Sequence, residues 1–514
     1  MKNLDFFSLV KVAEKINKRV LSENGDLQYK SVGDSLIDLN FSVSCLRNRI
    51  NNDEIKDIDD LFLECLSENK EKVLQWLLYL RDIYKGMGER EAFRHFMRLI
   101  RDKDEDLFNK IVKHIKVEDY GRWDDLIYVL DLKNKGRECN KVIIEKIKKQ
   151  LQQDILSASF GDETSLLAKW LPSCNTSSYK TRKYANYVRS ALGFKVRDYR
   201  RILSKLRRYL DVVEVEMSER SFGTICYEEV PAKAFMKYKK AFERNDMGRY
   251  LSFLEDISMG KKKINAKTLF LYEIVKAYRG SLCGEPCSLK YDELLESMWK
   301  NQERNTVLGN TLVVRDGSGS MTNEISRGVS ALAVGDSLTI YFSELCNSYF
   351  KNKMITFSTN PEVVDFSQCE SLNEKLVVLE KYNDCFNTDI ESVFKLVLDT
   401  AVKNKLKQED LPDNILIVSD MQFDCFSDEE ESCSVIDHMK EEYKKFGYKL
   451  PRLIFWNLSS FDITIPTQEN ENGIAFISGF SKNLVKLVVG GIENFRESLD
   501  KALDQYNIPE EVLN

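Results

Sequence analysis

The sequence contains few of the residues that most enzyme active sites need. It has three histidines, His95, His114 and His438, and none of them lies beside a plausible nucleophile. The Gly86-Met87-Gly88 segment lacks the preceding strand and the third glycine of a dinucleotide site, and no phosphate-loop lysine motif occurs. These absences predict a binding protein and make an enzyme the weaker hypothesis.

Long apolar runs and paired cysteine spacings are also missing. No stretch of about 18 uncharged apolar residues occurs, so we expect no membrane span. The 12 cysteines are spread without a pairing pattern, which predicts reduced thiols, no disulfides and a cytoplasmic or nuclear location. Cys283 and Cys287 form a single close pair, and a loop explains it better than a zinc site, which needs a second pair.

Charge is divided unequally along the chain. Residues 1–300 contain 56 Lys and Arg against 47 Asp and Glu, a net charge of +9, whereas residues 301–514 contain 20 against 35, a net charge of -15. A difference of this kind indicates separate domains with separate partners. The length of 514 residues also exceeds what one hydrophobic core normally serves. We therefore expect a first domain over residues 1–304 and a second over residues 305–514.

The first domain shows helical periodicity throughout. Apolar residues recur at intervals of three to four residues, and glycine or proline turns separate the segments. This pattern predicts an all-helical array of stacked helix pairs, of the HEAT-like kind, although no strict repeat is visible. The expected helices include Phe93 to Ile100, Leu107 to Ile115, Lys141 to Leu151, Tyr184 to Leu192, Val196 to Tyr209, Ala232 to Phe242 and Lys267 to Tyr278.

The second domain alternates short apolar runs with helical stretches. This order predicts an α/β fold with a doubly wound, largely parallel, Rossmann-like sheet. The expected strands are Thr311 to Val314, Met354 to Phe357, Ile415 to Val418, Leu453 to Trp456 and Ile474 to Ile477. The expected helices are Ser326 to Glu344, Leu372 to Lys381, Asp389 to Lys403, Cys433 to Phe446 and Asn494 to Tyr506.

Five oxygen-bearing side chains follow elements of this sheet. Asp316, Ser318 and Ser320 come directly after the first strand, Asp420 ends a later strand, and Thr388 precedes a helix. Because ligands bind beyond the carboxyl ends of parallel strands, these groups can converge on one edge. Two carboxylates and three hydroxyls suit Mg²⁺ or Mn²⁺, with one position open for water or an acidic partner. Taken singly, the same residues are also explained as turn and helix-cap residues.

This combination resembles the von Willebrand factor A domain and its metal-ion-dependent adhesion site. The family pattern is Asp-x-Ser-x-Ser after the first strand, then a later Thr, then an Asp at a later strand end. The resemblance covers residues 305 to 510, and it implies a metal ion that binds the carboxylate of an acidic protein ligand. Asn387 and Asp389 offer neighbouring oxygen atoms that compete with Thr388 for its expected role.

A basic window lies between Lys180 and Arg208. Its net charge is +10 over 29 residues, with Asp198 as its single acid, and four tyrosines interleave with the cations. Phosphates can pair with the cations while unpaired bases stack on the rings, which favours RNA, although a solvated helix surface explains the charge as well. The candidate RNA-binding residues are Lys180, Arg182, Lys183, Arg189, Lys195, Arg197, Arg200, Arg201, Lys205, Arg207 and Arg208.

The domain order resembles the Ro autoantigen (TROVE) proteins, in which a ring-shaped helical domain binds RNA and an A domain closes the ring. Several segments are also similar to an uncharacterised domain family related to that architecture: Leu80 to Arg90, Tyr120 to Leu126, Lys169 to Ser173 and Ser419 to Phe423. The resemblance implies a chaperone of structured or misfolded RNA. Two alternatives stay open: a metal-dependent protein-interaction scaffold without RNA, and a Mg²⁺-dependent phosphoesterase.

Overall fold

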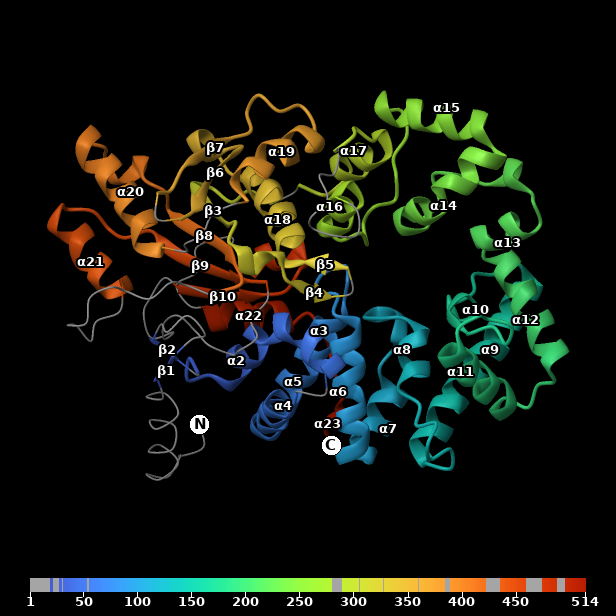
Figure 1. Ribbon diagram of the computed structural model, residues 1–514. Coiled ribbons are helices and arrows are strands. Elements are labelled where there is room, and N and C mark those ends of the chain that lie inside the picture. The colour runs from blue at the N-terminus through green and yellow to red at the C-terminus, as the bar shows by residue number, and fades with distance from the viewer. Residues whose placement is uncertain are drawn as a thin grey trace, which may run out of the picture. The chain divides into compact units, whose positions relative to one another are not determined.

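The computed structural model describes two compact units of the chain (Figure 1). The described residues are 31–52, 55–279, 289–304, 306–326, 328–358, 360–383, 389–421, 435–458, 474–487 and 495–514, with the backbone of 19–21 and 27–29. Unit 1 is Met1–Glu68 with Leu269–Ala502, and unit 2 is Asn69–Thr268 with Leu503–Asn514. Unit 2 carries 43 Lys and Arg against 32 Asp and Glu, a net charge of +11, which leaves -17 for unit 1.

Unit 1 is built on a six-stranded sheet with the strand order β10-β9-β8-β3-β6-β7. Neighbouring strands are parallel except for β7, which pairs antiparallel with β6. Every residue of β3, β8 and β10 is buried, as expected for strands covered on both faces. The strands are β3 (Thr311–Asp316), β6 (Lys353–Phe357), β7 (Val363–Asp365), β8 (Asn414–Ser419), β9 (Arg452–Asn457) and β10 (Ile474–Ser478).

Helices flank this sheet. Helix α18 packs against β3 and β8, helix α20 packs against β6 and α21, and α16 packs against α18. The N-terminal helix α2 packs on β10, where the Phe41 and Phe476 rings lie 5.4 Å apart. The helices of unit 1 are α2 (Ser35–Phe41), α3 (Val43–Asn52), α4 (Lys56–Glu68), α16 (Leu271–Arg279), α17 (Glu293–Lys300), α18 (Ala331–Leu345), α19 (Leu372–Leu379), α20 (Ile390–Asn404), α21 (Val435–Lys445) and α22 (Phe495–Leu503).

Unit 2 is helical, and polar side chains cap several of its helices. The side chain of Asp104 accepts a hydrogen bond from Leu107 N at the start of α7, and Ser178 accepts one from Thr181 N at the start of α11. The helices are α5 (Lys70–Arg81), α6 (Arg90–Lys103), α7 (Glu105–His114), α8 (Trp123–Tyr128), α9 (Glu138–Phe160), α10 (Leu167–Trp170), α11 (Tyr179–Ala191), α12 (Val196–Tyr209), α13 (Val213–Ser218), α14 (Ala232–Asn245), α15 (Met247–Ser258) and α23 (Glu510–Leu513).

A segment from near residue 506 completes unit 2. The amide of Gln75 donates a hydrogen bond to Tyr506 O at 3.1 Å, and the Tyr506 hydroxyl donates one to Asp82 at 2.9 Å. Helix α23 packs on α7. The compact units therefore interleave along the chain and differ from a single division after residue 304. Apolar periodicity identifies a helix but does not say which distant element its apolar face will cover.

The predicted combination of a helical region with a mostly parallel, helix-flanked sheet is confirmed. Within the described residues, no helix is both long enough and apolar enough to cross a membrane. The cysteines described as free thiols are Cys45, Cys65, Cys139, Cys174, Cys226, Cys346 and Cys369. Cys283 and Cys287 lie outside the described residues.

Candidate functional site

The candidate metal centre lies where the strand order of the sheet reverses. Strands β3 and β8 are parallel neighbours, and their register pairs Arg315 with Val418. Asp316 therefore lies beside Ser419, whose hydroxyl donates a hydrogen bond to Asp316 Oδ2 at 2.6 Å, and Asp420 follows directly. The two predicted carboxylates thus occupy adjacent strand ends at the switch point, which is where open α/β sheets bind ligands.

The two predicted serines follow Asp316 on a tight loop. The amide of Ser318 donates a hydrogen bond to Asp316 Oδ1 at 2.9 Å, and the Ser318 and Ser320 hydroxyls lie 2.9 Å apart. Ser320 belongs to the 3₁₀ turn Gly319–Thr322. Of the five predicted ligands, Asp316, Ser318, Ser320 and Asp420 therefore lie at the carboxyl ends of β3 and β8 or on the loop that follows β3. Thr388 lies outside the described residues.

Burial dominates the electrostatics of Asp316. The carboxyl group is fully buried, which raises its pKa, although hydrogen bonds from Ser419 and Ser318 and the nearby charge of Arg315 oppose that rise. Among the described residues, no lysine or arginine forms an ion pair with Asp316. The described residues contain no cluster of three or more His, Cys, Asp or Glu side chains suited to a metal. The donor set here is instead two carboxylates with hydroxyls, which hard divalent cations accept.

Arg315 fixes the backbone on which Asp316 stands. Its guanidinium pairs with Asp336 of α18 and donates to Tyr382 O at 2.9 Å and to Asn383 Oδ1 at 2.6 Å. Tyr382 O also approaches Gly317 so closely that a Cβ atom there would lie 2.5 Å from it. Only glycine fits between the two predicted ligands that flank this position. Met421, directly after Asp420, is buried and has a φ of 63°. This left-handed backbone conformation is rare for residues other than glycine.

The candidate nucleic-acid surface is the exposed side of α12 and α11. In α12 the residues Tyr199, Leu203 and Leu206 are buried at helical spacing. The opposite side of α12 is basic, and α11 presents a further set of exposed cations. Nine of the predicted residues are exposed: Lys180, Arg182, Lys183, Lys195, Arg197, Arg200, Arg201, Lys205 and Arg208.

Three of the predicted cations are engaged by the protein itself. Arg207 donates hydrogen bonds to Ala168 O, Ser173 Oγ and Leu171 O at 2.6–2.9 Å, and burial lowers the pKa of its guanidinium. Arg189 donates to Phe194 O at 2.6 Å, and Arg208 pairs with Glu219. Arg207 and Arg189 therefore hold loops in place and are poorly available to a ligand. Sequence cannot separate Arg207 from its neighbour Arg208.

The tyrosines of the basic window also differ in how far they are exposed to solvent. Tyr199 is buried and donates to Pro172 O, and Tyr184 packs edge-on against Tyr128 at 5.1 Å. Tyr179 is 67% exposed, with Lys183 Nζ 4.5 Å from its ring centroid. Of the interleaved aromatic rings, Tyr179 is therefore the one best placed to meet a base.

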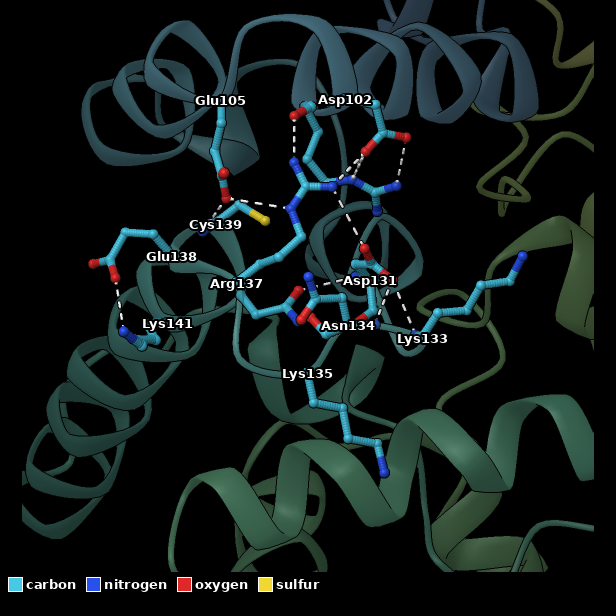
Figure 2. Close-up of polar contacts among 12 residues, drawn as sticks. Asp102, Glu105, Asp131, Lys133, Asn134, Lys135, Arg137, Glu138, Cys139 and Lys141 are labelled. Carbon is cyan, nitrogen blue, oxygen red and sulfur yellow. Dashed lines mark hydrogen bonds and ion pairs between the residues drawn. The ribbon is translucent and has the colours of Figure 1, made fainter.

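Sequence reasoning missed two features of unit 2. The α8–α9 loop, residues 131–137, exposes Lys133 and Lys135 outside the basic window between Lys180 and Arg208 (Figure 2). Asp125 accepts a hydrogen bond from Arg122 N at the start of α8. It is also the buried centre of an ion-pair network, at 2.7 Å from both Arg81 and Arg94. The basic sequence Lys-Asn-Lys-Gly-Arg at residues 133–137 could have identified the loop. No local sequence pattern indicates the ion pairs of Asp125 with Arg81 and Arg94.

Comparison with known proteins identifies a relative over nearly the whole chain. An uncharacterised protein, L728, of Acanthamoeba polyphaga mimivirus is 30% identical over 509 residues, which cover 92% of this chain and 85% of the viral protein. The chain belongs to the family of this viral protein. The similarity to this relative spans both units.

Two family models divide the same region. A domain of unknown function, DUF2828, matches residues 140–310, and a second, DUF7788, matches residues 310–511. The candidate metal residues Asp316 to Asp420 fall within the second, and the basic helices α11 and α12 fall within the first. The α8–α9 loop precedes both matches. The two candidate sites therefore fall within the matches of two different family models.

Proposed function

We propose that the helical unit binds RNA through the exposed cations of α11 and α12. The observation that carries this proposal is the two-sided character of α12. Its apolar side is buried in the unit, while Arg197, Arg200, Arg201 and Lys205 face solvent with Asp198 as the one acid among them. A surface that existed for solubility alone would be expected to mix both signs of charge. A track of one sign fits the phosphate backbone of a nucleic acid.

The spacing of these cations supports a backbone track. Arg197, Arg201 and Lys205 are each four residues apart, so they rise along the helix in steps of about 6 Å. The arginine forks suit phosphate oxygens because they donate two parallel hydrogen bonds. The Ro-like architecture inferred from the sequence gives the same class of ligand, a structured or misfolded RNA.

A salt titration of RNA binding tests this proposal. Binding of a fluorescein-labelled, random-sequence single-stranded RNA to the full chain should weaken linearly on logarithmic axes as salt rises. The triple variant R197E/R200E/R201E should reduce the affinity and the salt slope. The matched control K103E/K113E/K116E changes the charge equally at exposed positions on and beside α6 and α7 and should retain both. Absence of RNA binding would favour the alternative of a protein-interaction scaffold, in which the helices bind protein partners.

A second candidate function is the binding of Mg²⁺ or Mn²⁺ by the sheet unit. The juxtaposition of Asp316 and Asp420 at the switch point supports it, and Ser318 and Ser320 would complete the described part of the shell. The ion would act as a Lewis acid that accepts a carboxylate oxygen of an acidic protein ligand, as in a von Willebrand A domain. Asp316 and Asp420 would orient the ion by charge, and the serine hydroxyls would leave it electrophilic.

Electron paramagnetic resonance of added Mn²⁺ tests this second function. The wild-type chain should bind one equivalent, and the D316N and S318A variants should lose that binding while they stay folded. The same preparations serve for an RNA-cleavage assay with Mg²⁺. Cleavage that disappears in both variants would establish the phosphoesterase alternative instead. Wild-type protein that leaves the Mn²⁺ signal unchanged would reject the metal site.

A further inference from the structure

The α8–α9 loop is held in place by an unusually dense set of contacts around Arg137. The Arg137 guanidinium donates to Arg101 O at 2.8 Å and pairs with Asp102 at 2.6 Å and with Glu105 and Asp131 at 3.4 Å each. Figure 2 shows these groups converging on Arg137 from α6, α7 and the loop itself. The three acidic side chains nearest the loop are therefore already paired with arginine within the protein.

Polar side chains also fix the backbone of the loop tip. Asp131 accepts hydrogen bonds from the amides of Lys133 and Asn134 at 2.9 and 3.0 Å. The buried Asn140 accepts one from Asp131 N and donates to Asp131 O and Asn134 O at 2.9–3.2 Å. A loop restrained in this way loses little conformational entropy when it binds a ligand. Its exposed residues are 133–136, and two of these four are lysines.

The loop continues the basic surface of α11. The Tyr187 hydroxyl donates a hydrogen bond to Lys135 O at 3.1 Å, which joins α11 to the loop tip. Lys183 precedes Tyr187 by one helical turn, and its ammonium lies over the ring of Tyr179, a further turn back. Tyr179, Lys183 and Tyr187 share one side of α11, and the loop tip that carries Lys135 and Lys133 joins this helix at Tyr187. These five residues are named here the α11 ridge. In the described residues, the ammonium groups of Lys133 and Lys135 pair with no carboxylate.

We propose that the α11 ridge binds a single strand of RNA, with Lys133, Lys135 and Lys183 on its phosphates and Tyr179 stacked on an unpaired base. This inference rests on the proposed RNA binding and extends it to residues outside α11 and α12. A single strand fits better than a duplex because only unpaired bases offer a free face to an exposed aromatic ring. Because the backbone of the loop is already ordered, Lys133 and Lys135 are held at the binding surface before RNA binds.

The competing explanation is that the loop merely starts α9. Arg137 and Asn140 would then serve to order the helix start, and the two exposed lysines would be interchangeable with any polar residue. The two explanations differ in what the lysines do to the salt dependence of RNA binding. They do not differ in what the lysines do to stability, since both side chains are exposed.

The test is a salt titration of the K133A/K135A variant with the labelled single-stranded RNA. Loss of two phosphate contacts should lower the slope of log affinity against log salt by about 1.4 and weaken binding roughly tenfold at low salt. The control K113A/K116A removes two exposed lysines at and just after the end of α7, and it should leave the slope unchanged. A slope equal to that of wild type in K133A/K135A overturns the ridge and leaves RNA binding by α12 intact.

The role of Tyr179 is tested with the same RNA and an abasic oligonucleotide of equal length. Y179A should lose several-fold affinity for the base-bearing RNA and none for the abasic strand, whereas Y179F should bind both as wild type does. Equal loss on both strands would overturn the stacking. Absence of wild-type RNA binding would overturn the proposed function and the ridge together, an outcome that a change confined to K133A/K135A or Y179A cannot produce.

Discussion

Arg315 and Asp336 form an ion pair in which both side chains are 0% exposed, with Arg315 Nη2 2.7 Å from Asp336 Oδ1. Arg279 also reaches Asp336, at 2.7 Å from its second oxygen. The pair joins β3 to α18 one residue before Asp316. Buried ions of this kind are costly to separate because each would keep its charge without water. The buried ion pair therefore holds in place the end of β3, which carries the candidate metal ligand Asp316.

Replacing Arg315 with Met should destabilise the protein strongly. The change leaves Asp336 short of a partner and removes the donor to Tyr382 O, so we expect a loss of about 3–5 kcal/mol in chemical denaturation. Lys353→Met is the matched control on the neighbouring strand β6, because its 3.7 Å pair with Asp365 is partly exposed to solvent. The control should change stability by less than about 1 kcal/mol. Similar losses in the two variants would contradict the importance of the buried pair.

Two glycines of the Asp-Gly-Ser-Gly-Ser segment should respond differently to alanine. A Cβ atom at residue 317 would lie 2.5 Å from Tyr382 O, whereas one at residue 319 would meet nothing within 4 Å. We expect Gly317→Ala to lower the free energy of unfolding by about 1–3 kcal/mol and to weaken Mn²⁺ binding, since the backbone must shift. Gly319→Ala should change neither quantity. Denaturation and Mn²⁺ titration of both variants decide the matter, and equal behaviour would count against this geometry.

Glu344 should make the sheet unit sensitive to acid. Burial by itself raises the pKa of Glu344, but Lys375 at 2.7 Å and Arg304 at 2.8 Å outweigh burial and hold that pKa below its usual value. A carboxylate with a depressed folded pKa stabilises the protein above its unfolded pKa, about 4.3, and loses that contribution as the pH falls through the folded value.

Unfolding of wild type and Glu344→Gln between pH 7 and pH 3 tests this dependence. The variant should be less stable by about 3 kcal/mol at neutral pH, because two cations lose their partner, and the difference should shrink in acid. The exposed Glu409, which pairs with Lys407 at 3.4 Å, offers the control Glu409→Gln. A constant difference across the whole pH range would mean that Glu344 is not the titrating group.

Arg207 and Arg201 should separate stability from RNA binding. Arg207→Ala removes three hydrogen bonds to the α10 region, so we expect a loss of about 2–3 kcal/mol in stability with an unchanged salt slope for RNA. Arg201 is exposed, and Arg201→Ala should keep stability while it lowers the slope by about 0.7. Thermal denaturation and salt titration of both variants provide the measurement. A reduced slope in Arg207→Ala would show that this residue does reach the ligand.

Local pattern predicted most elements of the fold. The expected helix Val196 to Tyr209 coincides with α12, because its apolar residues recur at helical spacing between polar ones. The five expected strands fall within β3, β6, β8, β9 and β10, since each is a short apolar run. The helix expected from Ser326 begins instead at Ala331, after the short strands β4 (Glu324–Ser326) and β5 (Val329–Ser330). Ser330 then caps it by accepting a hydrogen bond from Ala333 N.

Long-range relations were beyond the reach of the sequence. The three-residue strand β7 carries too little pattern to be recognised, and the pairing of Arg315 with Asp336 spans 21 residues without a local signal. Part of the candidate metal centre was predictable because parallel strands bring their carboxyl ends together. The division of the basic window into exposed and engaged cations was not predictable, because it depends on which carbonyl groups neighbouring loops present.

The interleaving of the two units constrains how the chain can fold during synthesis. Unit 1 takes its α2 from residues translated early, yet the sheet strand β10 that α2 covers emerges more than 430 residues later. Unit 2 likewise cannot form the hydrogen bonds of Gln75 and Asp82 to Tyr506 until that residue has been translated. Unit 1 therefore cannot mature before residues 69–268 have been made, and unit 2 cannot mature before residue 506 has been made, so both should become resistant to protease only late in synthesis.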